Sequence, residues 1–318
     1  MADKKVIAVI GATGAQGRGL VRAILDDKEG DFAVRALSRD VNGERAKELV
    51  EWGAELVAAD LDDIESLHQA FQGAHGVYAN TFFWNTFSPE KDTEHARNMA
   101  AAAKQAGVQH LIWSTLEDTR KWIPLGDDRM PTLMGTYKVP HLDVKGETDR
   151  FFIDEGVPTT FLLTSFYWDN MIYFGMGPRR GEDGDLIFAL PMGDKKLAGI
   201  AAEDIGKCAY GIFKGGPAEY VGKYIGIAGE HLTGDELALS LSKAYGLKVQ
   251  YHNMPPAMYR GLGFPGAEDL GNMFQYFQEY EQVFCGARDI GTSRRLNAAL
   301  QTFDEWLANH KHRIPIEQ

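Results

Sequence analysis

A glycine-rich turn close to the start of the chain limits the possible folds more than any other stretch. The apolar residues 6–10 lead directly into Gly11, Gly14 and Gly17, and the amphipathic segment 20–25 follows. Strand, tight turn and helix in this order are typical of a dinucleotide-binding unit, because the glycines let the backbone turn, approach a pyrophosphate and pack the helix on the strand. The alternative is an ordinary strand-to-helix turn. We predict that a nucleotide pyrophosphate binds at the helix N-terminus, on Gly11, Ala12, Thr13, Gly14, Ala15, Gln16 and Gly17.

Strand-like and helix-like segments alternate over the first half of the chain. Strands are expected over residues 32–39, 55–58, 75–80, 110–114 and 159–163, and helices over 44–52, 60–71, 93–106 and 140–152. This alternation predicts an α/β fold with a doubly wound parallel sheet of the Rossmann type.

Two stretches depart from this alternation. Residues 118–139 form a loop so long that we interpret it as a functional lid or a mobile segment. Beyond Gly175, glycine, proline and charged residues dominate until a strand expected over 186–190. Residues 224–227 are expected to return to the main sheet, and the last third of the chain, from Pro255, is expected to be mainly helical.

The charge of the chain argues against several classes of partner. Its 318 residues carry a formal net charge of −12, and the 33 lysines and arginines are scattered rather than gathered in blocks. Nucleic acid and anionic membranes are therefore not expected as partners. Cys208 and Cys285 lie far apart and form no metal-binding pattern, so no metal is expected. A polar N-terminus without room for a signal peptide, and the lack of a long apolar run, lead us to expect a cytoplasmic protein.

The end of the second expected strand indicates which nicotinamide nucleotide binds. An acidic residue there accepts hydrogen bonds from a free ribose 2′-hydroxyl, whereas a guanidinium can pair with a 2′-phosphate. The strand ends in Ser38 and Arg39, so NADP(H) is preferred over NAD(H). Asp40 leaves an alternative open, because it takes the acid's role if the strand ends one residue later. Asp60 and Leu61, after the third strand, are expected where the adenine ring would lie; the alternative interpretation is a helix N-cap, and both roles can hold together.

Several stretches of the chain resemble the NmrA-like branch of the atypical short-chain dehydrogenase/reductases. They are the glycine turn with Ser38 and Arg39, residues 59–62, residues 145–147 and the distant segment 262–270. The resemblance implies a Rossmann domain over residues 1–165, completed by parts of 197–230, and a smaller C-terminal α/β domain over 166–318. It also implies that NADP(H) lies in the cleft between the two domains.

The same resemblance implies two walls around the nicotinamide. One follows the fourth strand, at Thr81, Phe82 and Phe83, and the second follows the sixth strand, at Tyr167, Trp168, Asp169 and Asn170. Packing in a core or between domains is the alternative interpretation of both aromatic groups.

The catalytic pair of the short-chain reductases is altered in this chain. Those enzymes use Tyr-x-x-x-Lys on a helix, in which the lysine binds the ribose and lowers the tyrosine pKa, so that the phenol exchanges a proton with the substrate carbonyl. Here the corresponding residues are His141 and Lys145, on one helix face, with Ser114 at the end of the fifth strand. His141 either donates a proton itself or is a polar residue at a helix start.

Tyr137 is a further candidate for the missing tyrosine's role, because it lies one helical turn upstream of His141 by count. However, Pro140 biases the residue before it away from helical geometry. We therefore expect Tyr137 in the loop before the helix.

Two hypotheses follow from a complete nucleotide-binding turn and an incomplete proton relay. The first is a redox-responsive regulator that binds NADP(H) without turnover and engages a protein partner. The second is an NADPH-dependent reductase of a small carbonyl, quinone or aromatic substrate, with a proton from His141, Tyr137 or water. Steady NADPH oxidation that is lost in a Lys145→Ala variant contradicts the first, and tight binding without turnover counts against the second. The resemblance also leaves a homodimer open.

Overall fold

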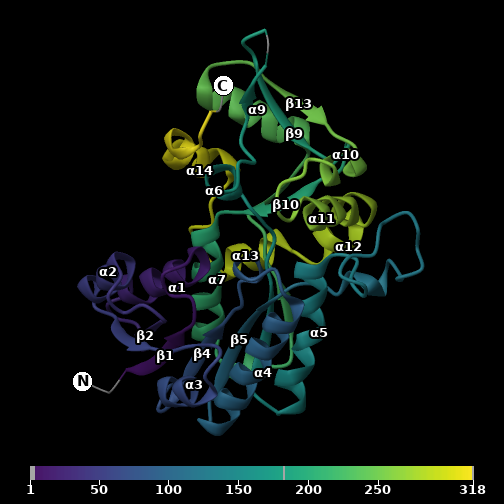
Figure 1. Ribbon diagram of the computed structural model, residues 1–318. Helices are drawn as coiled ribbons and strands as arrows, with labels where there is room; N and C mark the ends of the chain where they lie inside the picture. Colours follow the sequence, from purple (N-terminus) through teal and green to yellow (C-terminus); the bar gives the residue numbers. More distant parts are fainter. Residues whose placement is uncertain (1–3, 182, 317–318) are drawn as a thin grey trace.

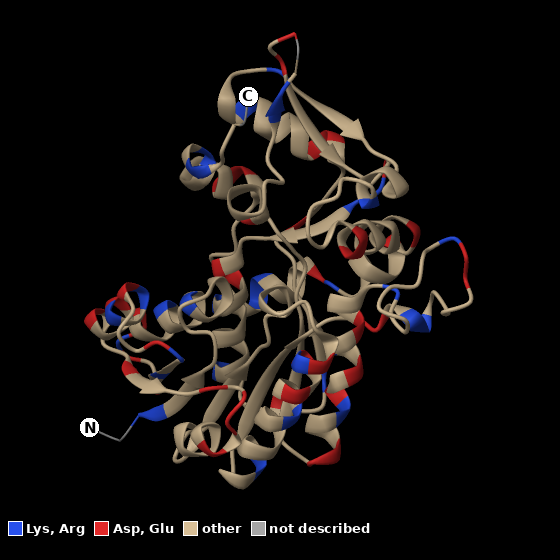
Figure 2. Cartoon of the chain, in the orientation of Figure 1, with Lys and Arg blue, Asp and Glu red and all other residues tan. Residues whose placement is uncertain are grey.

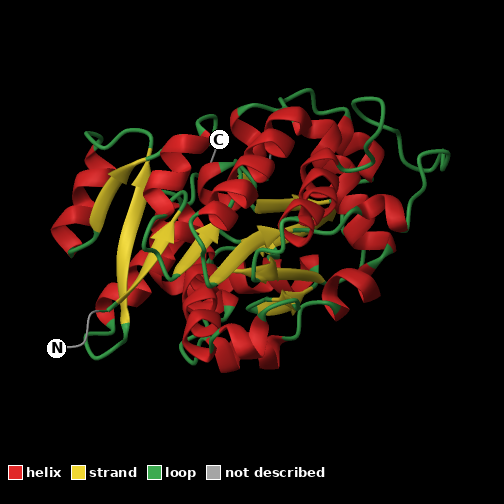
Figure 3. Ribbon diagram, turned by 90° about the horizontal axis from the view of Figure 1, so that it is seen from below, coloured by secondary structure: helices red, strands yellow, loops and turns green. Residues whose placement is uncertain are grey.

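The computed structural model describes residues 4–181 and 183–316, and a seven-stranded parallel sheet forms its centre (Figures 1 and 3). The strands lie in the order β11-β6-β5-β4-β1-β2-β3. Because the order reverses between β1 and β4, the sheet is doubly wound and Rossmann-like. The strands are β1 (Lys5–Val9), β2 (Phe32–Ser38), β3 (Glu55–Ala58), β4 (Gly76–Ala79), β5 (His110–Thr115), β6 (Thr159–Leu163) and β11 (Tyr224–Gly226).

Helices cover both faces of this sheet, and β1 shows why its strands are apolar throughout. Ile7 and Val9 belong to one buried cluster, with α1, α2 and α7, whereas Ala8 and Ile10 belong to another, with α3, α4 and α5. Successive side chains of a strand point to opposite faces, so a strand covered on both sides has no polar face. The helices are α1 (Ala15–Asp26), α2 (Glu44–Trp52), α3 (Ile64–Phe71), α4 (Pro89–Gln105), α5 (Pro140–Asp154) and α7 (Ala202–Gly215).

The first helix packs on a helix that comes almost two hundred residues later. A Cβ atom at Gly19 of α1 would lie 2.3 Å from the Glu203 carbonyl oxygen, and one at Gly206 of α7 would lie 2.1 Å from the Leu20 nitrogen. Glycine at both positions lets the two backbones approach closely. A helix from the second half of the chain therefore packs on α1. It is followed by α8 (Pro217–Tyr220) and by β11, the edge strand of the main sheet.

The rest of the chain forms what we call the C-terminal region, namely β7 to β10, β12 to α12, and α14. It contains two three-stranded sheets, β12-β10-β7 and β13-β9-β8, around a large apolar cluster to which loop 118–139 and the start of α5 also contribute. Its strands are β7 (Phe166–Tyr167), β8 (Arg179–Arg180), β9 (Leu186–Leu190), β10 (Leu197–Ile200), β12 (Glu230–Leu232) and β13 (Val249–Asn253). Its helices are α6 (Asn170–Tyr173), α9 (Gly234–Tyr245), α10 (Pro256–Arg260), α11 (Ala267–Glu279), α12 (Glu281–Gly286) and α14 (Phe303–His310), whereas α13 (Ile290–Leu296) packs on the main sheet's helices.

Most predicted elements are confirmed, with shifts at their ends. The helix expected from residue 93 begins at Pro89, because the Ser88 hydroxyl caps it by accepting from the Lys91 amide. Pro140 starts α5 as predicted, after Val139 in a non-helical conformation. Residues 118–139 form a loop whose residues Ile123 and Met130 are buried in the apolar cluster of the C-terminal region.

Charged residues of both signs are interspersed over the helices, as α4 and α5 show in Figure 2. Among residues 4–181 and 183–316, no helix is long and apolar enough to cross a membrane. The cytoplasmic location stays a prediction.

Candidate functional site

The glycine turn joins β1 to α1 in the geometry that a pyrophosphate requires. Gly11 has a φ of +66°, which favours glycine, and its carbonyl oxygen accepts from the Gly14 amide at 2.8 Å. A Cβ atom at Gly17 would lie 2.4 Å from that same oxygen, so glycine is needed for α1 to start this close to the turn. Gly14 is the N-cap, and no side chain of the described residues caps the helix. The first-turn amides can therefore receive an anion.

The Gln16 side chain connects this turn to three strands. Its Oε1 accepts from the Tyr78 hydroxyl of β4 and, at 2.9 Å, from Ser114 Oγ of β5, and its Nε2 donates to the Tyr167 hydroxyl of β7. Burial raises the pKa of both tyrosines, which keeps their hydroxyls protonated at neutral pH. The hydroxyl of Ser114 is thus bonded to the glycine turn.

The end of β2 separates the two candidate determinants of nucleotide preference. β2 ends at Ser38, and the Arg39 side chain that follows is exposed. Asp40 Oδ1 accepts from the amides of Asn42 and Gly43 at 2.9 and 3.0 Å, so the turn before α2 already uses this carboxylate. Both side chains are exposed, and they differ in that the turn before α2 already uses the Oδ1 atom of Asp40.

Asp60 and Leu61 lie in an ordered loop after β3. Asp63, rather than Asp60, caps α3 by accepting from two first-turn amides. Asp60 Oδ1 accepts from the Asp62 amide at 3.1 Å, and the Leu61 carbonyl accepts from Asn98 of α4 at 2.8 Å. The helix-cap alternative for Asp60 is therefore wrong, and the adenine contact stays a prediction.

The ammonium group of Lys145 lies against the loop that follows β4. Its Nζ donates to Asn80 Oδ1 at 3.2 Å, to the Thr81 carbonyl at 3.1 Å and to Thr81 Oγ1 at 2.9 Å. These acceptors match the three protons of an ammonium group. Thr81 Oγ1 donates in turn to the buried carboxylate of Asp92 at 2.7 Å. Burial lowers the pKa of Lys145 to about 8, against the opposing charges of Asp92 and Asp149.

His141 forms a buried pair with Asp269, from the first turn of α11. The imidazole Nδ1 lies 2.7 Å from Asp269 Oδ1, and the His141 amide donates to Oδ2 at 3.2 Å. The ring also packs on Trp84 and Phe83, at centroid distances of 4.7 and 6.2 Å. Because a carboxylate holds Nδ1, Nε2 is the nitrogen left for a ligand.

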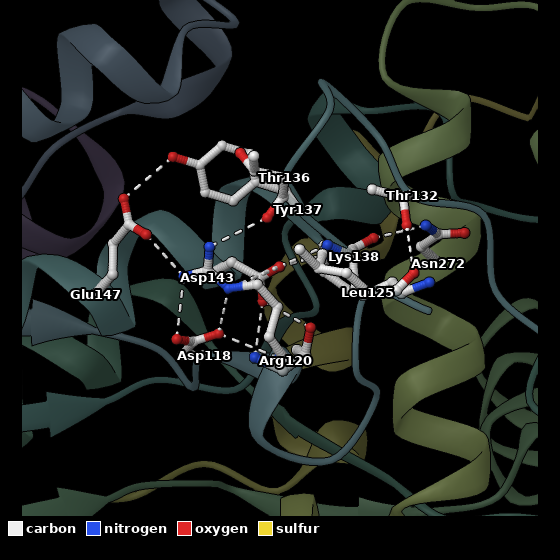
Figure 4. Close-up of polar contacts among 12 residues, drawn as sticks. Asp118, Arg120, Leu125, Thr132, Thr136, Tyr137, Lys138, Asp143, Glu147 and Asn272 are labelled. Carbon is white, nitrogen blue, oxygen red and sulfur yellow. Dashed lines mark hydrogen bonds and ion pairs between the residues drawn. The ribbon is translucent and has the colours of Figure 1, made fainter. Parts of the chain in front are cut away.

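Tyr137 does not face the side of α5 that carries Lys145. Its hydroxyl donates to Glu147 Oε1 at 3.1 Å, and the Arg120 guanidinium lies 5.0 Å from the centre of its ring (Figure 4). Lys145 and Glu147 are two residues apart, which is roughly 200° around an α-helix. Tyr137 lies in the loop before α5, as predicted, and it points away from the ammonium group.

The expected wall after β4 has one exposed and one buried ring. Phe82 is 50 % exposed, whereas Phe83 is 2 % exposed and contacts the imidazole of His141. Thr81, between the strand and these rings, is buried and bonded to Lys145. This loop is therefore fixed by the same lysine that the resemblance assigns to the cofactor.

The expected wall after β6 is mostly turned towards the C-terminal region. Trp168 is buried on Phe303 and Trp306, at centroid distances of 5.3 and 6.2 Å. Asp169 Oδ2 accepts from the first amide of α7 at 2.9 Å, and Asn170 begins α6. Trp168 thus packs in the C-terminal region, whereas the hydroxyl of Tyr167 bonds to Gln16 of the glycine turn.

Sequence reasoning missed Asp269 and Trp84. Segment 262–270 carries the resemblance without an assigned task, yet it supplies the partner of His141 from 128 residues away. A histidine in a buried first turn needs a polar partner, but no local pattern says where in the chain that partner lies.

Comparisons with known proteins agree with the resemblance. A sequence model of the NmrA-like family matches residues 3–307. An NmrA-like family domain-containing oxidoreductase, ptmS, of Penicillium ochrochloron is 27% identical over 317 residues, covering 93% of this chain and 91% of that protein. Crystal structures of NmrA, a negative transcriptional regulator, in complex with NAD and with NADP are 25% identical and cover 96% of this chain and 95% of theirs, with a TM-score of 0.77. A triphenylmethane reductase of Citrobacter sp., complexed with NADP(H), shares the fold at 18% identity, with a TM-score of 0.72 over 96% of this chain and 99% of that one.

Proposed function

The chain belongs to the NmrA-like family, and on that premise we propose that it is a regulator that binds NADP(H) and changes its interactions with a partner protein accordingly. The observation that carries the proposal is how the groups expected to form a proton relay are bonded. Each donates to a different acceptor, and within the described residues none is bonded to another: Ser114 to Gln16, His141 to Asp269, Lys145 to Asn80 and Thr81, and Tyr137 to Glu147. In this arrangement no chain of hydrogen bonds among these four residues would carry a proton to a substrate, so we propose nucleotide binding without catalysis.

Nucleotide binding is supported by the glycine turn. The uncapped first turn of α1, the left-handed Gly11 and the close approach at Gly17 fit a pyrophosphate. The NmrA complexes with NAD and NADP support the same class of ligand. The preference for NADP(H) is supported by Arg39, which is exposed at the end of β2, and by Asp40, whose carboxylate the adjacent turn uses.

In this proposal the nucleotide lies between two domains. Residues 1–165 with α7 and β11 form the dinucleotide-binding domain, and the C-terminal region forms the opposite wall. A partner protein that prefers either the nucleotide-bound or the nucleotide-free form shifts the population towards that form. By linkage, the partner changes nucleotide affinity by the same factor by which the nucleotide changes partner affinity.

Titration of the protein with NADPH and with NADH tests the proposal, with the six tryptophans as fluorescent reporters. We expect saturable binding of both nucleotides, with NADPH tighter, and no steady NADPH oxidation with carbonyl or quinone probes. Failure to bind either nucleotide contradicts the proposal. Steady oxidation that disappears in Lys145→Ala also contradicts it.

One observation favours a second candidate function, an NADPH-dependent reductase. The Asp269 carboxylate on Nδ1 orients the imidazole of His141, and Nε2 is then the ring nitrogen that could pass a proton to a carbonyl oxygen as hydride reaches the carbon. The test is NADPH oxidation with 9,10-phenanthrenequinone in the wild type and in His141→Gln. Turnover that depends on His141 supports this candidate, and equal rates in both proteins contradict it.

A further inference from the structure

Segment 262–270 brings the start of α11 against the loop that follows β4. Gly263 and Gly266 have φ values of +76° and +88°, so the turn between α10 and α11 uses two left-handed glycines. A Cβ atom at Gly266 would lie 2.7 Å from the Trp84 ring. The turn is therefore shaped to place the first residues of α11 beside Trp84 and His141.

One face of α11 is polar and yet buried. Asp269, Asn272 and Gln275 follow one another at three-residue spacing, and they are 4, 0 and 7 % exposed. Each of them bonds to a residue of the stretch 129–141. Asn272 Nδ2 donates to the Lys138 carbonyl at 2.6 Å (Figure 4) and to the Pro131 carbonyl at 2.9 Å. Gln275 Nε2 donates to the Arg129 carbonyl at 3.0 Å. Asp269 adds its two contacts with His141.

Arg260 of α10 fixes the orientation of the two amides on this face. Its Nη1 donates to Asn272 Oδ1 at 3.1 Å and to Gln275 Oε1 at 2.8 Å, so both NH₂ groups are left to donate. Both reach carbonyls of residues 129–141, and that of Gln275 also donates to Glu279 Oε1 at 2.7 Å. A Cβ atom at Gly271 would lie 2.4 Å from Arg260 Cγ, so the small residue lets Arg260 lie across α11. The polar face is thus a connected network whose donors and acceptors are matched.

We propose that Asp269 is a positioning residue of the nucleotide site, acting through His141, and that the polar face of α11 couples the nicotinamide end of that site to the C-terminal region. The proposal rests on the proposed nucleotide binding. Asp269 holds both the backbone and the ring of His141, so the imidazole cannot shift without moving α11 or breaking a buried hydrogen bond. A buried network that is partly broken is costly, which favours two discrete arrangements over gradual drift.

The chemistry of the free Nε2 indicates which part of the nucleotide it meets. His141 shares a helix face with Lys145, and its ring contacts residues of the loop after β4. The nicotinamide half offers a carboxamide and ribose hydroxyls, each able to donate to or accept from an imidazole nitrogen. The proposed place of the adenylate half is Arg39 and the glycine turn, so it is the nicotinamide half that we assign to His141.

Hydrogen exchange with mass spectrometry, with and without ligand, tests this coupling. In the wild type we expect NADPH to slow amide exchange in residues 129–141 and in α11, whereas 2′,5′-ADP, which lacks the nicotinamide half, slows exchange only at the glycine turn and the end of β2. In Asp269→Asn we expect the NADPH effect on α11 to be lost and NADPH affinity to fall about 5- to 10-fold. Glu268→Gln is the matched control, since it removes the same charge from an exposed neighbour in the same helical turn, and it should behave as the wild type.

The outcomes separate this inference from the proposed function. If the wild type binds NADPH but residues 129–141 and α11 exchange as before, or if Asp269→Asn retains the full effect, the coupling is refuted while nucleotide binding stands. If the wild type binds no NADPH, both fail. Should Asp269→Asn not fold, the comparison of NADPH with 2′,5′-ADP in the wild type decides alone, because equal protection of α11 by both ligands overturns the proposal.

Discussion

Arg39 and Asp40 are neighbours of opposite charge with different tasks. Both are exposed at the end of β2, and Asp40 Oδ1 also accepts from two amides of the turn before α2. We expect Arg39→Gln to weaken NADPH binding about 10- to 100-fold, because a charge-assisted contact with a 2′-phosphate contributes about 1.5–3 kcal/mol. NADH has no such phosphate, so its affinity should change less than about twofold.

Isothermal titration calorimetry with NADPH and with NADH measures the two affinities in the wild type and in Arg39→Gln. Arg45→Gln, at the exposed start of α2, is the control for a general loss of positive charge. Equal weakening of NADPH and NADH would show that Arg39 does not recognise the phosphate.

Among single residues, those that belong to a local sequence pattern could be predicted, whereas contacts between residues far apart in the sequence could not. The strand, turn and helix around the glycines are confirmed, because Gly11 and Gly17 meet local backbone requirements, whereas nucleotide binding there stays a prediction. The Asp269 partner of His141 could not be predicted, because it depends on where α11 lies. The side of α5 that Tyr137 faces depends in the same way on Arg120 and Glu147.

Among the elements, α1 owes its position to α7. Gly206 allows the Leu20 backbone to approach, and a Cβ atom there would lie 2.1 Å from the Leu20 nitrogen. We expect Gly206→Ala to lower the free energy of unfolding by about 2–4 kcal/mol, since a backbone contact cannot be relieved by a side-chain rotation. Urea denaturation measures it, and Gly286→Ala, whose Cβ would meet nothing within 4 Å, is the control. Equal effects of both substitutions would mean that the close packing of α1 and α7 contributes nothing specific.

Asp149 ties α5 to two strands of the sheet. Its Oδ1 accepts from Trp113 Nε1 and Thr115 Oγ1 at 2.9 and 2.7 Å, and its Oδ2 accepts from the Tyr224 hydroxyl of β11 at 2.9 Å. Burial raises the pKa of Asp149 to about 7. Between about pH 4 and pH 7 the folded chain therefore holds a proton that the unfolded chain releases, so this contribution to stability is full at low pH and is lost as pH rises through 7.

Asp149→Asn keeps the shape and removes the titration. Relative to the wild type, we expect this variant to gain roughly 1–3 kcal/mol in unfolding free energy between pH 5 and pH 8. Urea denaturation at the two pH values measures this difference. Asp154→Asn, at an exposed position of the same helix, should show no comparable change, and a flat difference for Asp149→Asn would contradict the buried protonated carboxyl.

Over the whole molecule, a buried ion pair joins the main sheet to the C-terminal region. Arg288, after α12, is fully buried and pairs through Nη1 and Nη2 with Glu117, beyond β5, at 2.5 and 2.9 Å, and its Nε donates to the Thr164 carbonyl at 2.7 Å. We expect Arg288→Met to cost about 3–5 kcal/mol in unfolding free energy, because it leaves a buried carboxylate unpaired. Chemical denaturation measures this. Glu117→Gln in the same chain should restore part of the loss, and an additive double variant would refute a direct coupling.

The architecture was predictable to the extent that neighbours in the sequence are neighbours in space. The alternating strands and helices of residues 5–163 gave the parallel sheet, because each βα unit has its own apolar period. The contribution of α7 to the packing of α1 and the fit of loop 118–139 into a distant apolar cluster depend on contacts of long sequence separation, which no window of the sequence contains.

The packing of α7 on α1 also determines how late in synthesis on the ribosome α1 can reach its final environment. The glycine turn and α1 emerge among the first residues, but the helix that packs on α1 spans Ala202–Gly215. At about 5–20 residues per second, on the order of ten seconds or more separates the two. During that interval the apolar face of the first helix lacks the helix that covers it, so a chain released before residue 215 exposes an apolar surface of the kind that chaperones and proteases recognise.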